Sequence, residues 1–171
     1  MGVIDGLIAQ LPGEPIPVRA VVAGIHWTAV TSRGCGLAAS CLAGDNGSEQ
    51  DLPDAGQYHL RSVQELVQGL HSENVLEATL GLAAYSSTLV PPDDQAIELN
   101  AFDLLAQRGA GKNVVMVGHF PQVEWLRDRV GSLKVLEKRQ RPGDYPAEAA
   151  PDLIPSADLV AITAMTILNH T

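Results

Sequence analysis

A short turn in the second half of the chain carries residue types that could do chemistry. The sequence Gly-His-Phe-Pro occupies residues 118–121, and Glu137 and Asp144 follow it. A neutral His119 imidazole could bind a divalent metal ion together with the two carboxylates, because nitrogen and oxygen donors of this kind suit such ions. The alternative is that His119 only hydrogen-bonds to the backbone of its own turn. No HxxxH or CxxC spacing supports a metal site directly.

The residues around this turn predict a buried strand, a tight turn and a helix. The run 113–117 is almost entirely apolar, as in a parallel strand that is covered on both faces. Gly118 permits the turn, and Pro121 suits the first position of a helix. His119 would then lie at a helix N-terminus, where the helix dipole disfavours an imidazolium and leaves a neutral nitrogen available.

Glu137 also admits a different chemistry. It lies nineteen residues after Gly118, and an acidic residue at about that distance binds the ribose in dinucleotide-binding folds. The glycine pattern of those folds is absent, so a pyrophosphate could not approach the backbone as closely. A third alternative is a Glu137 side chain that meets only solvent.

The second half of the chain reads as strands alternating with helices, which indicates a parallel sheet. We expect a helix that is closed by Gly109 and Gly111, and strands at 113–117, 133–137 and 159–163. Ligands bind at the carboxyl ends of such strands, where residues 118–120, 137–138 and 163–166 would meet. If these three strands, numbered along the chain, lie side by side in the order 3-2-1, the strand at 113–117 has one unpaired edge. Such an edge tends to recruit another strand.

The first half has an α+β pattern. We expect three strands, at 17–24, 27–32 and 36–41, between a short N-terminal helix and a pair of later helices. Ser62 and Glu65 have capping-box spacing at the start of the first of that pair. The stretch 86–94, which contains Pro91 and Pro92, is the best boundary. These features predict two domains, residues 1–92 and residues 93–171.

One cysteine of the first half is a further candidate. Cys35 lies between two glycines, where a thiolate ligand would be sterically open, although a small buried filler is the simpler interpretation. Cys35 and Cys41 lie on one expected strand and cannot bend to meet, so we expect reduced thiols and a cytoplasmic protein. Trp27 is expected in the core.

Composition excludes several classes of protein. The net charge of −9 argues against a nucleic-acid partner, and no apolar stretch is long enough for a membrane helix. With 46% hydrophobic and 18% charged residues, the chain should be globular.

Several short motifs, taken in order, resemble the proteins that combine a DUF4213 domain with a DUF364 domain, the latter also called the heavy-metal chelation domain. The motifs occupy residues 24–30, 34–38, 117–121, 136–137, 142–144, 154–158 and 163–171. The resemblance implies an enolase N-terminal-like α+β domain followed by a Rossmann-like domain, with a site between them. The family pattern leads us to expect a further strand after Thr171, so the Rossmann-like domain would be incomplete at its C-terminus.

Together, these features define the expected site and its alternatives. The expected ligand-binding residues are Gly118, His119, Phe120, Glu137, Thr163, Thr166 and Asn169, and the expected metal ligands are His119, Glu137, Asp144 and Cys35. Their partner would be a divalent metal ion or a metal-chelating small molecule. An enzyme that uses a nucleotide-type ligand such as S-adenosylmethionine, and a structural or regulatory subunit, remain open, as does a homo-oligomer.

Overall fold

The computed structural model describes residues 2–40, 51–89 and 97–169, and it divides the chain into two compact units. Unit 1 comprises residues 1–95 together with 165–170, and unit 2 comprises residues 96–164. Unit 1 contains an antiparallel sheet with helices, and unit 2 contains a parallel sheet with helices, so the protein is of the α/β class. Each unit is described by itself below. No described helix is long and apolar enough to cross a membrane.

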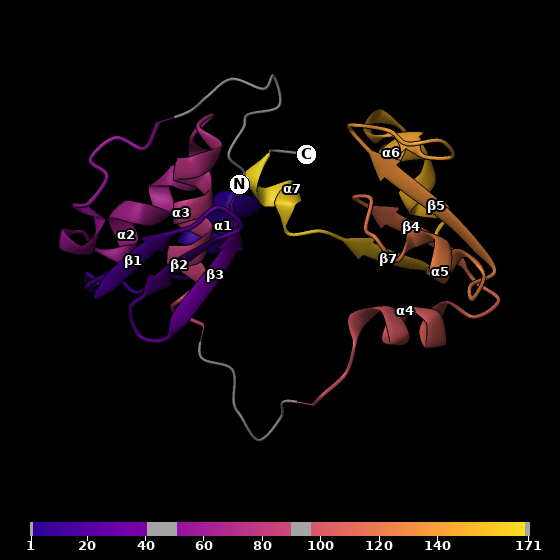
Figure 1. The fold of residues 1–171 in the computed structure, drawn as a ribbon, viewed down its shortest axis with the longest axis horizontal. Coiled ribbons are helices and arrows are strands. Elements are labelled where there is room, and N and C mark those ends of the chain that lie inside the picture. The colour runs from indigo at the N-terminus through magenta and orange to yellow at the C-terminus, as the bar shows by residue number, and fades with distance from the viewer. Residues whose placement is uncertain (1, 41–50, 90–96, 170–171) are drawn as a thin grey trace. The chain divides into compact units, whose positions relative to one another are not determined.

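Unit 1 is built on a three-stranded antiparallel sheet with the order β1-β2-β3. The strands are β1 (Ala20–Ala23), β2 (Trp27–Thr31) and β3 (Cys35–Ala39), close to the expected ranges. Alternate residues of β2 and β3 are buried, because successive side chains of a strand point to opposite faces. The buried face packs against the long helix α3 (Val75–Ser86), as Figure 1 shows.

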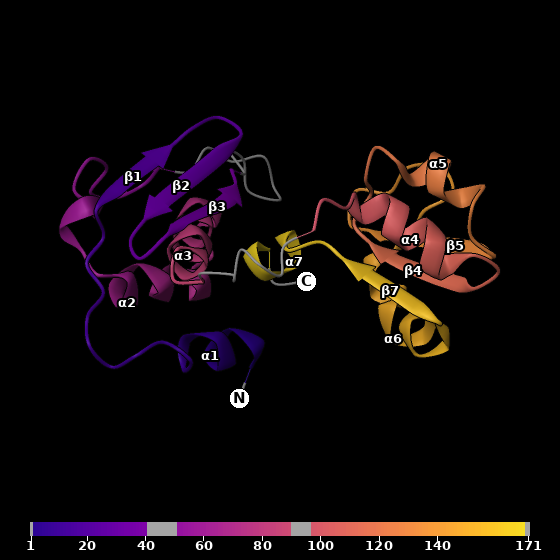
Figure 2. The same ribbon diagram turned by 90° about the horizontal axis from the view of Figure 1, so that it is seen from below.

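Helices form the rest of unit 1. Figure 2 shows the sheet, then α2 (Val63–Leu66) and α3, then α1 (Val3–Ile8) in successive layers. The predicted capping box is confirmed: Ser62 accepts the Glu65 backbone N–H, and the Glu65 carboxylate accepts the Ser62 N–H at 2.7 Å. Two single-turn elements, η1 (Tyr58–Leu60) and η2 (Val67–His71), flank α2.

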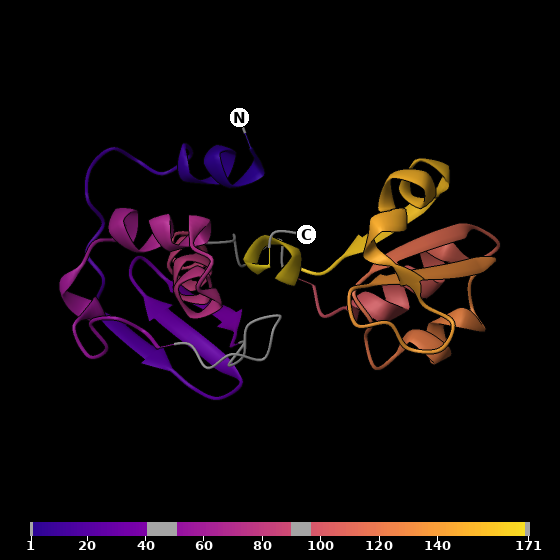
Figure 3. The ribbon, with the colours of Figure 1, turned by 90° about the horizontal axis from the view of Figure 1, so that it is seen from above.

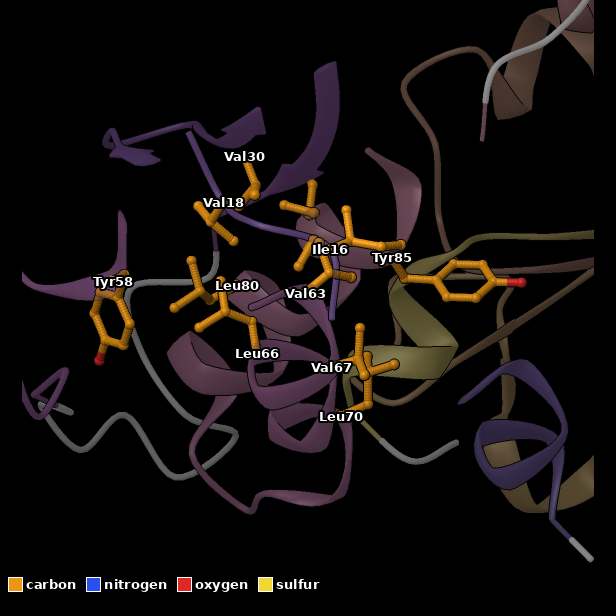
Figure 4. Close-up of a cluster of buried hydrophobic side chains, with 13 residues drawn as sticks. Ile16, Val18, Val30, Tyr58, Val63, Leu66, Val67, Leu70, Leu80 and Tyr85 are labelled. Atoms are coloured by element: carbon orange, nitrogen blue, oxygen red, sulfur yellow. The ribbon is translucent and has the colours of Figure 1, made fainter. Parts of the chain in front are cut away.

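The core of unit 1 lies between the sheet and these helices (Figure 4). Its members are mostly branched aliphatic residues, which sit well in a close-packed interior. They include Ile16, Val18, Val30, Val63, Leu66, Val67, Leu70 and Leu80. Each of these residues is at most 5% exposed, so the first half of the chain has a hydrophobic core of its own.

Unit 2 is a four-stranded parallel sheet with the order β6-β5-β4-β7. The strands are β4 (Asn113–Val117), β5 (Ser132–Glu137), β6 (Tyr145–Pro146) and β7 (Leu159–Ile162). The order expected from the sequence is therefore wrong. The two-residue strand β6 takes the place beside β5, and β7 pairs with the other side of β4, so β4 is central and has no open edge.

Helices cover both faces of this sheet. Helices α4 (Ala101–Gly109) and α5 (Val123–Arg127) share an apolar cluster with β4 and β5, which contains Met116 and Leu126. Figures 2 and 3 show α6 (Ala150–Leu153) on the opposite face. Two single turns, η4 (Ala147–Ala149) and η5 (Ile154–Ser156), flank α6.

After β7 the chain returns to unit 1. Helix α7 (Met165–Leu168) packs there against α3. Leu168 is 2% exposed in a small cluster with Val75 and Ala78, and Met165 packs against the same cluster.

Candidate ligand site at the carboxyl edge of the unit 2 sheet

The turn after β4 depends on a glycine. Gly118 has a φ of +101°, a region that side chains other than glycine rarely adopt. Its N–H donates to the Leu136 carbonyl at 2.9 Å, which fixes the turn to the end of β5. A Cβ added to Gly118 would lie 2.9 Å from Cγ2 of Thr163. The ends of β4, β5 and β7 therefore meet around this residue.

His119 and Asp144 form a closely bonded pair. His119 Nδ1 lies 3.0 Å from Oδ1 and 2.8 Å from Oδ2 of Asp144. The side chain of Asp144 is 0% exposed and that of His119 is 12% exposed, so the imidazole is held by a carboxylate that water does not reach. The opposite ring nitrogen, Nε2, makes no hydrogen bond to any described residue. Metal-binding histidines commonly have this arrangement, because the carboxylate fixes the ring orientation and raises its basicity.

The helix that was expected to begin at Pro121 begins later. Gln122 is the N-cap and α5 starts at Val123, so His119 does not lie at a helix N-terminus. The prediction that a helix dipole acts on this ring is wrong. A tight turn fills residues 121–122 instead, and the ring bonds to the carboxylate of Asp144.

Glu137 connects two backbone segments. Its Oε2 accepts the His119 N–H at 2.9 Å, and its Oε1 accepts the Arg139 N–H at 3.1 Å. The residue is half-buried. Glu137 therefore joins the turn after β4 to the loop after β5, and it holds the backbone of His119 while Asp144 holds the ring.

Phe120 and Thr163 complete this edge of the sheet. The Phe120 ring meets the Phe102 ring edge-to-face, with 5.6 Å between their centroids, and packs against the unit 2 core. The Thr163 N–H donates to the Val117 carbonyl at 3.1 Å and so continues the pairing of β7 with β4.

The remaining expected site residues belong to unit 1. Thr166 and Asn169 lie in or just after α7, and the Asn169 N–H donates to the Met165 carbonyl at 3.1 Å. Cys35 is exposed at the start of β3, so the expectation of a buried filler is wrong. Trp27, expected in the core, is 59% exposed because it points away from α3.

The described residues contain no group of three or more His, Cys, Asp and Glu side chains that could hold a metal ion together. The carboxylates of Glu137 and Asp144 instead accept hydrogen bonds from backbone N–H groups, and Asp144 also bonds to the imidazole.

A basic loop beside the site did not figure in the expected site beyond its first residue. The sequence Lys-Arg-Gln-Arg fills residues 138–141, directly after β5. The Arg141 N–H donates to Oδ2 of Asp144 at 2.9 Å, and the Asp144 N–H donates to the Arg141 carbonyl at 3.0 Å. The sequence signal for this loop is the occurrence of three cationic residues within four positions of a chain whose net charge is −9.

Unit 1 contains a separate hollow of about 390 Å³ beside α2 and η2. Tyr58, Arg61, His71 and Glu77 are among the residues that line it. Several of its polar groups bond to one another: Ser72 donates to Glu77 at 2.5 Å, and the Tyr58 hydroxyl donates to the Pro53 carbonyl. Burial is the main cause that raises the pKa of Tyr58.

Comparison with known proteins places this chain in a family. The DUF4213 model matches residues 4–89 and the DUF364 model matches residues 100–171, and the description of both is "Putative heavy-metal chelation". The chain belongs to this DUF4213/DUF364 family. No curated protein matches it.

Two solved structures are similar to the chain over almost its whole length. A protein of unknown function from the DUF364 family of Desulfitobacterium hafniense DCB-2 is 28% identical, with a TM-score of 0.81. The match covers 99% of this chain and 70% of that one. A second DUF364 protein of unknown function, from Pyrococcus horikoshii, is 18% identical with a TM-score of 0.67, covers 98% and 69%, and supports the fold alone.

Proposed function

We propose that the protein binds a heavy-metal ion, delivered by a metal-chelating small molecule, through Nε2 of His119. The observation that carries this proposal is the pair in which the buried Asp144 carboxylate holds Nδ1 of His119 at 2.8 Å. A carboxylate at Nδ1 selects the tautomer whose Nε2 lone pair points away from the bond, and that lone pair is the donor a metal needs. The description of the matched family agrees with this chemistry.

The chelated form of the metal suits a single imidazole better than the bare ion. One nitrogen fills one coordination position, and a transition-metal ion needs four or more ligands. Both oxygens of Glu137 accept backbone N–H groups, and the Asp144 side chain is 0% exposed. A small-molecule chelator brings most of the ligands itself and leaves an open position for His119.

The same proposal assigns a fold family to each unit. We infer that unit 1 is enolase N-terminal-like and unit 2 Rossmann-like. Support for the second assignment comes from the strand order β6-β5-β4-β7, which corresponds to 3-2-1-4 when the strands are numbered along unit 2. Doubly wound dinucleotide-binding folds begin with that order, and they bind ligands at the carboxyl edge where His119 lies.

An enzyme that binds a nucleotide-type ligand is the second candidate function. It depends on Glu137 accepting hydrogen bonds from a ribose. In the structure each oxygen of this carboxylate already accepts a backbone N–H, although each retains a second lone pair. These two hydrogen bonds leave less of the carboxylate for a ribose, and so they favour the metal-chelate proposal.

Metal binding tests the proposal directly. Calorimetric titration of the protein, made without a histidine tag, with Ni²⁺ and with Ni²⁺–nitrilotriacetate should show binding that His119→Ala abolishes. Asp144→Asn should weaken binding by about 10–100-fold, because the ring loses the partner that orients it. Circular dichroism would establish that both variants fold.

Unit 1 supplies a matched control. His71 and Asp5 form another imidazole–carboxylate pair, with 3.5 Å between Nε2 and Oδ1 and with both side chains about half exposed. His71→Ala should leave the affinity unchanged. Equal losses in His71→Ala and His119→Ala, or full binding by His119→Ala, would overturn the proposal.

A further inference from the structure

We propose that two copies of the protein associate through the outer face of the unit 1 sheet, the face opposite α3. The proposal concerns an interaction surface, so it goes beyond the proposed function and does not depend on it. Within the described part of unit 1, the helices lie on one face of the sheet. Figure 2 shows β1, β2 and β3 as the layer on the other side of α3 from α1.

The strand pairing decides which side chains lie on this outer face. The register aligns Val22, Ala29 and Leu37 in one row across the three strands. Val30, next to Ala29 in β2, is 0% exposed and belongs to the unit 1 core. Because successive side chains of a strand alternate between faces, the row points away from that core. The outward positions of the three strands are Ala20, Val22, Trp27, Ala29, Thr31, Cys35, Leu37 and Ala39.

None of these outward side chains is charged. An antiparallel sheet with one solvated face usually directs apolar residues to the core and polar residues to water. Two chains with a net charge of −9 repel each other, and contact through an uncharged face opposes that repulsion least. Arg19, directly before β1, and Arg33, in the turn between β2 and β3, are exposed at one end of the face. An apolar centre with a polar rim is typical of protein interfaces.

The exposed area of this face fits a dimer contact. Val22, Trp27 and Leu37 are 64%, 59% and 57% exposed. With the smaller residues, the face exposes about 500 Å² per copy, near the upper end for the largest apolar patch of a monomer. Two such faces together bury about 1,000 Å², and rim residues raise this to about 1,200 Å², the lower end for specific interfaces. We therefore expect a dimer that dissociates on dilution.

The sizes of the side chains suit a second copy of the same face. Val22 and Leu37 lie on the two edge strands, and the small residue Ala29 lies between them on the central strand. Two sheets that pack face to face lie about 10 Å apart, and the side chains of their inner faces interdigitate. A two-fold axis uses the same patch on both copies, so large side chains of one copy meet small ones of the other.

Lysine substitutions on and off the face test the proposal. Light scattering of the untagged protein over a range of concentrations should show a dimer. Leu37→Lys should weaken it about 100-fold, because a two-fold interface contains each substitution twice and each buried charge costs about tenfold. The control is Leu60→Lys, which makes the same charge change at a 73% exposed residue of η1 and should leave the dimer intact. Val22→Lys and Val3→Lys form a second matched pair, because Val3 is 76% exposed in α1.

Trp27 provides a measurement that needs no substitution on the face. In the Trp125→Phe protein, the fluorescence comes from Trp27 alone, since the chain has two tryptophans. Its emission should move to longer wavelength as the dimer is diluted, because the ring then meets water. This measurement decides the question if circular dichroism shows that the face variants do not fold.

Three results would overturn the proposal. The first is a protein that stays monomeric at every concentration. The second is a dimer that Leu37→Lys and Val22→Lys weaken no more than their controls do. The third is a dimer that dissociates without any change in the emission of Trp27, since its contact would then lie elsewhere on the chain.

Discussion

At the scale of single residues, the Glu137 carboxylate joins two backbone segments. It accepts the N–H of His119 at 2.9 Å and the N–H of Arg139 at 3.1 Å. A glutamine at this position offers one acceptor oxygen and one amide that can only donate. One of the two backbone N–H groups would then face a donor and lose its partner.

Glu137→Gln should therefore destabilise unit 2 by about 1–2 kcal/mol, the cost of leaving one partly buried donor unsatisfied. Urea unfolding followed by Trp125 fluorescence measures this. The control is Glu124→Gln, whose side chain is 77% exposed and pairs with Arg127 at 3.5 Å. It should cost less than about 0.5 kcal/mol, as exposed ion pairs do. Equal effects of the two substitutions would contradict the bridging role.

The same residue separates the two candidate functions. If Glu137 binds a ribose diol, Glu137→Gln should weaken a nucleotide-type ligand and leave metal uptake nearly intact. If it acts only through the backbone of His119, metal-chelate binding should weaken modestly, and nucleotide-type ligands should not bind either protein. A thermal-shift screen with S-adenosylmethionine would distinguish these outcomes, since a ligand at 100 times its Kd adds about 2.7 kcal/mol.

The sequence could indicate which of these residues meet, but not how they bond. Parallel strands bring the residues after β4 and β5 to one edge, so the proximity of His119 and Glu137 follows from two apolar runs and their spacing. The bonding does not follow. Asp144 bonds to His119 at the end of a turn in which Gly143 has a φ of +91°. The Pro142-Gly143 pair predicts that turn, and the Asp144 N–H donates to the Arg141 carbonyl at 3.0 Å. The pair does not predict that the Asp144 carboxylate then bonds to a ring 25 residues earlier in the chain.

At the scale of elements, α3 lies so close to the sheet of unit 1 that one position must be glycine. A Cβ added to Gly36 in β3 would lie 2.1 Å from the Ala83 carbonyl oxygen and 2.3 Å from the Ser87 nitrogen. Both obstacles are backbone atoms of α3 or its cap, which cannot move aside as a flexible side chain would. The helix would have to shift away from the whole sheet.

Gly36→Ala should cost about 3 kcal/mol or more, at the upper end of the range for overpacked cores. Gly6→Ala is the control, because nothing lies within 4 Å of its added Cβ in the middle of α1. That change should stabilise unit 1 by about 0.5–1 kcal/mol, as alanine does within a helix. Urea unfolding followed at Trp27 would compare the two, and a mild effect of Gly36→Ala would mean that α3 is not packed this closely.

Most elements could be predicted from local patterns, whereas the strand order of unit 2 could not. The apolar runs at β4 and β5 and the Ser62–Glu65 capping box are signals within a few residues of one another. Strand β6 has only two residues, too few for any periodicity. Once β6 occupies the place beside β5, the crossover through α6 brings β7 to the other side of β4.

At the scale of the whole molecule, the chain leaves unit 1, builds unit 2 and returns to unit 1. Residues 165–170 join residues 1–95 in one compact unit. Helix α7 contributes Leu168 to a cluster with Val75 and Ala78, where it is 2% exposed. A short helix near the far end of the sequence thus adds to the core that the first half of the chain begins.

The two tryptophans report on the two units separately. Trp27 lies in β2 of unit 1 and Trp125 in α5 of unit 2, and the chain has no others. Trp125→Phe leaves fluorescence that follows unit 1 alone, and Trp27→Phe leaves fluorescence that follows unit 2 alone. Denaturation of these two single-tryptophan proteins therefore assigns any loss of stability to one unit.

Leu168→Ala should lower the stability of unit 1 by about 2–5 kcal/mol, because it removes a buried side chain and leaves a cavity against α3. The Trp27 transition should move to lower urea concentration, and the Trp125 transition should move much less. Leu126→Ala, which removes a 0% exposed side chain from the unit 2 core, should give the opposite pattern. A Leu168→Ala protein whose Trp125 transition shifts while its Trp27 transition stays in place would show that α7 stabilises unit 2, contrary to the packing of Leu168 on Val75 and Ala78.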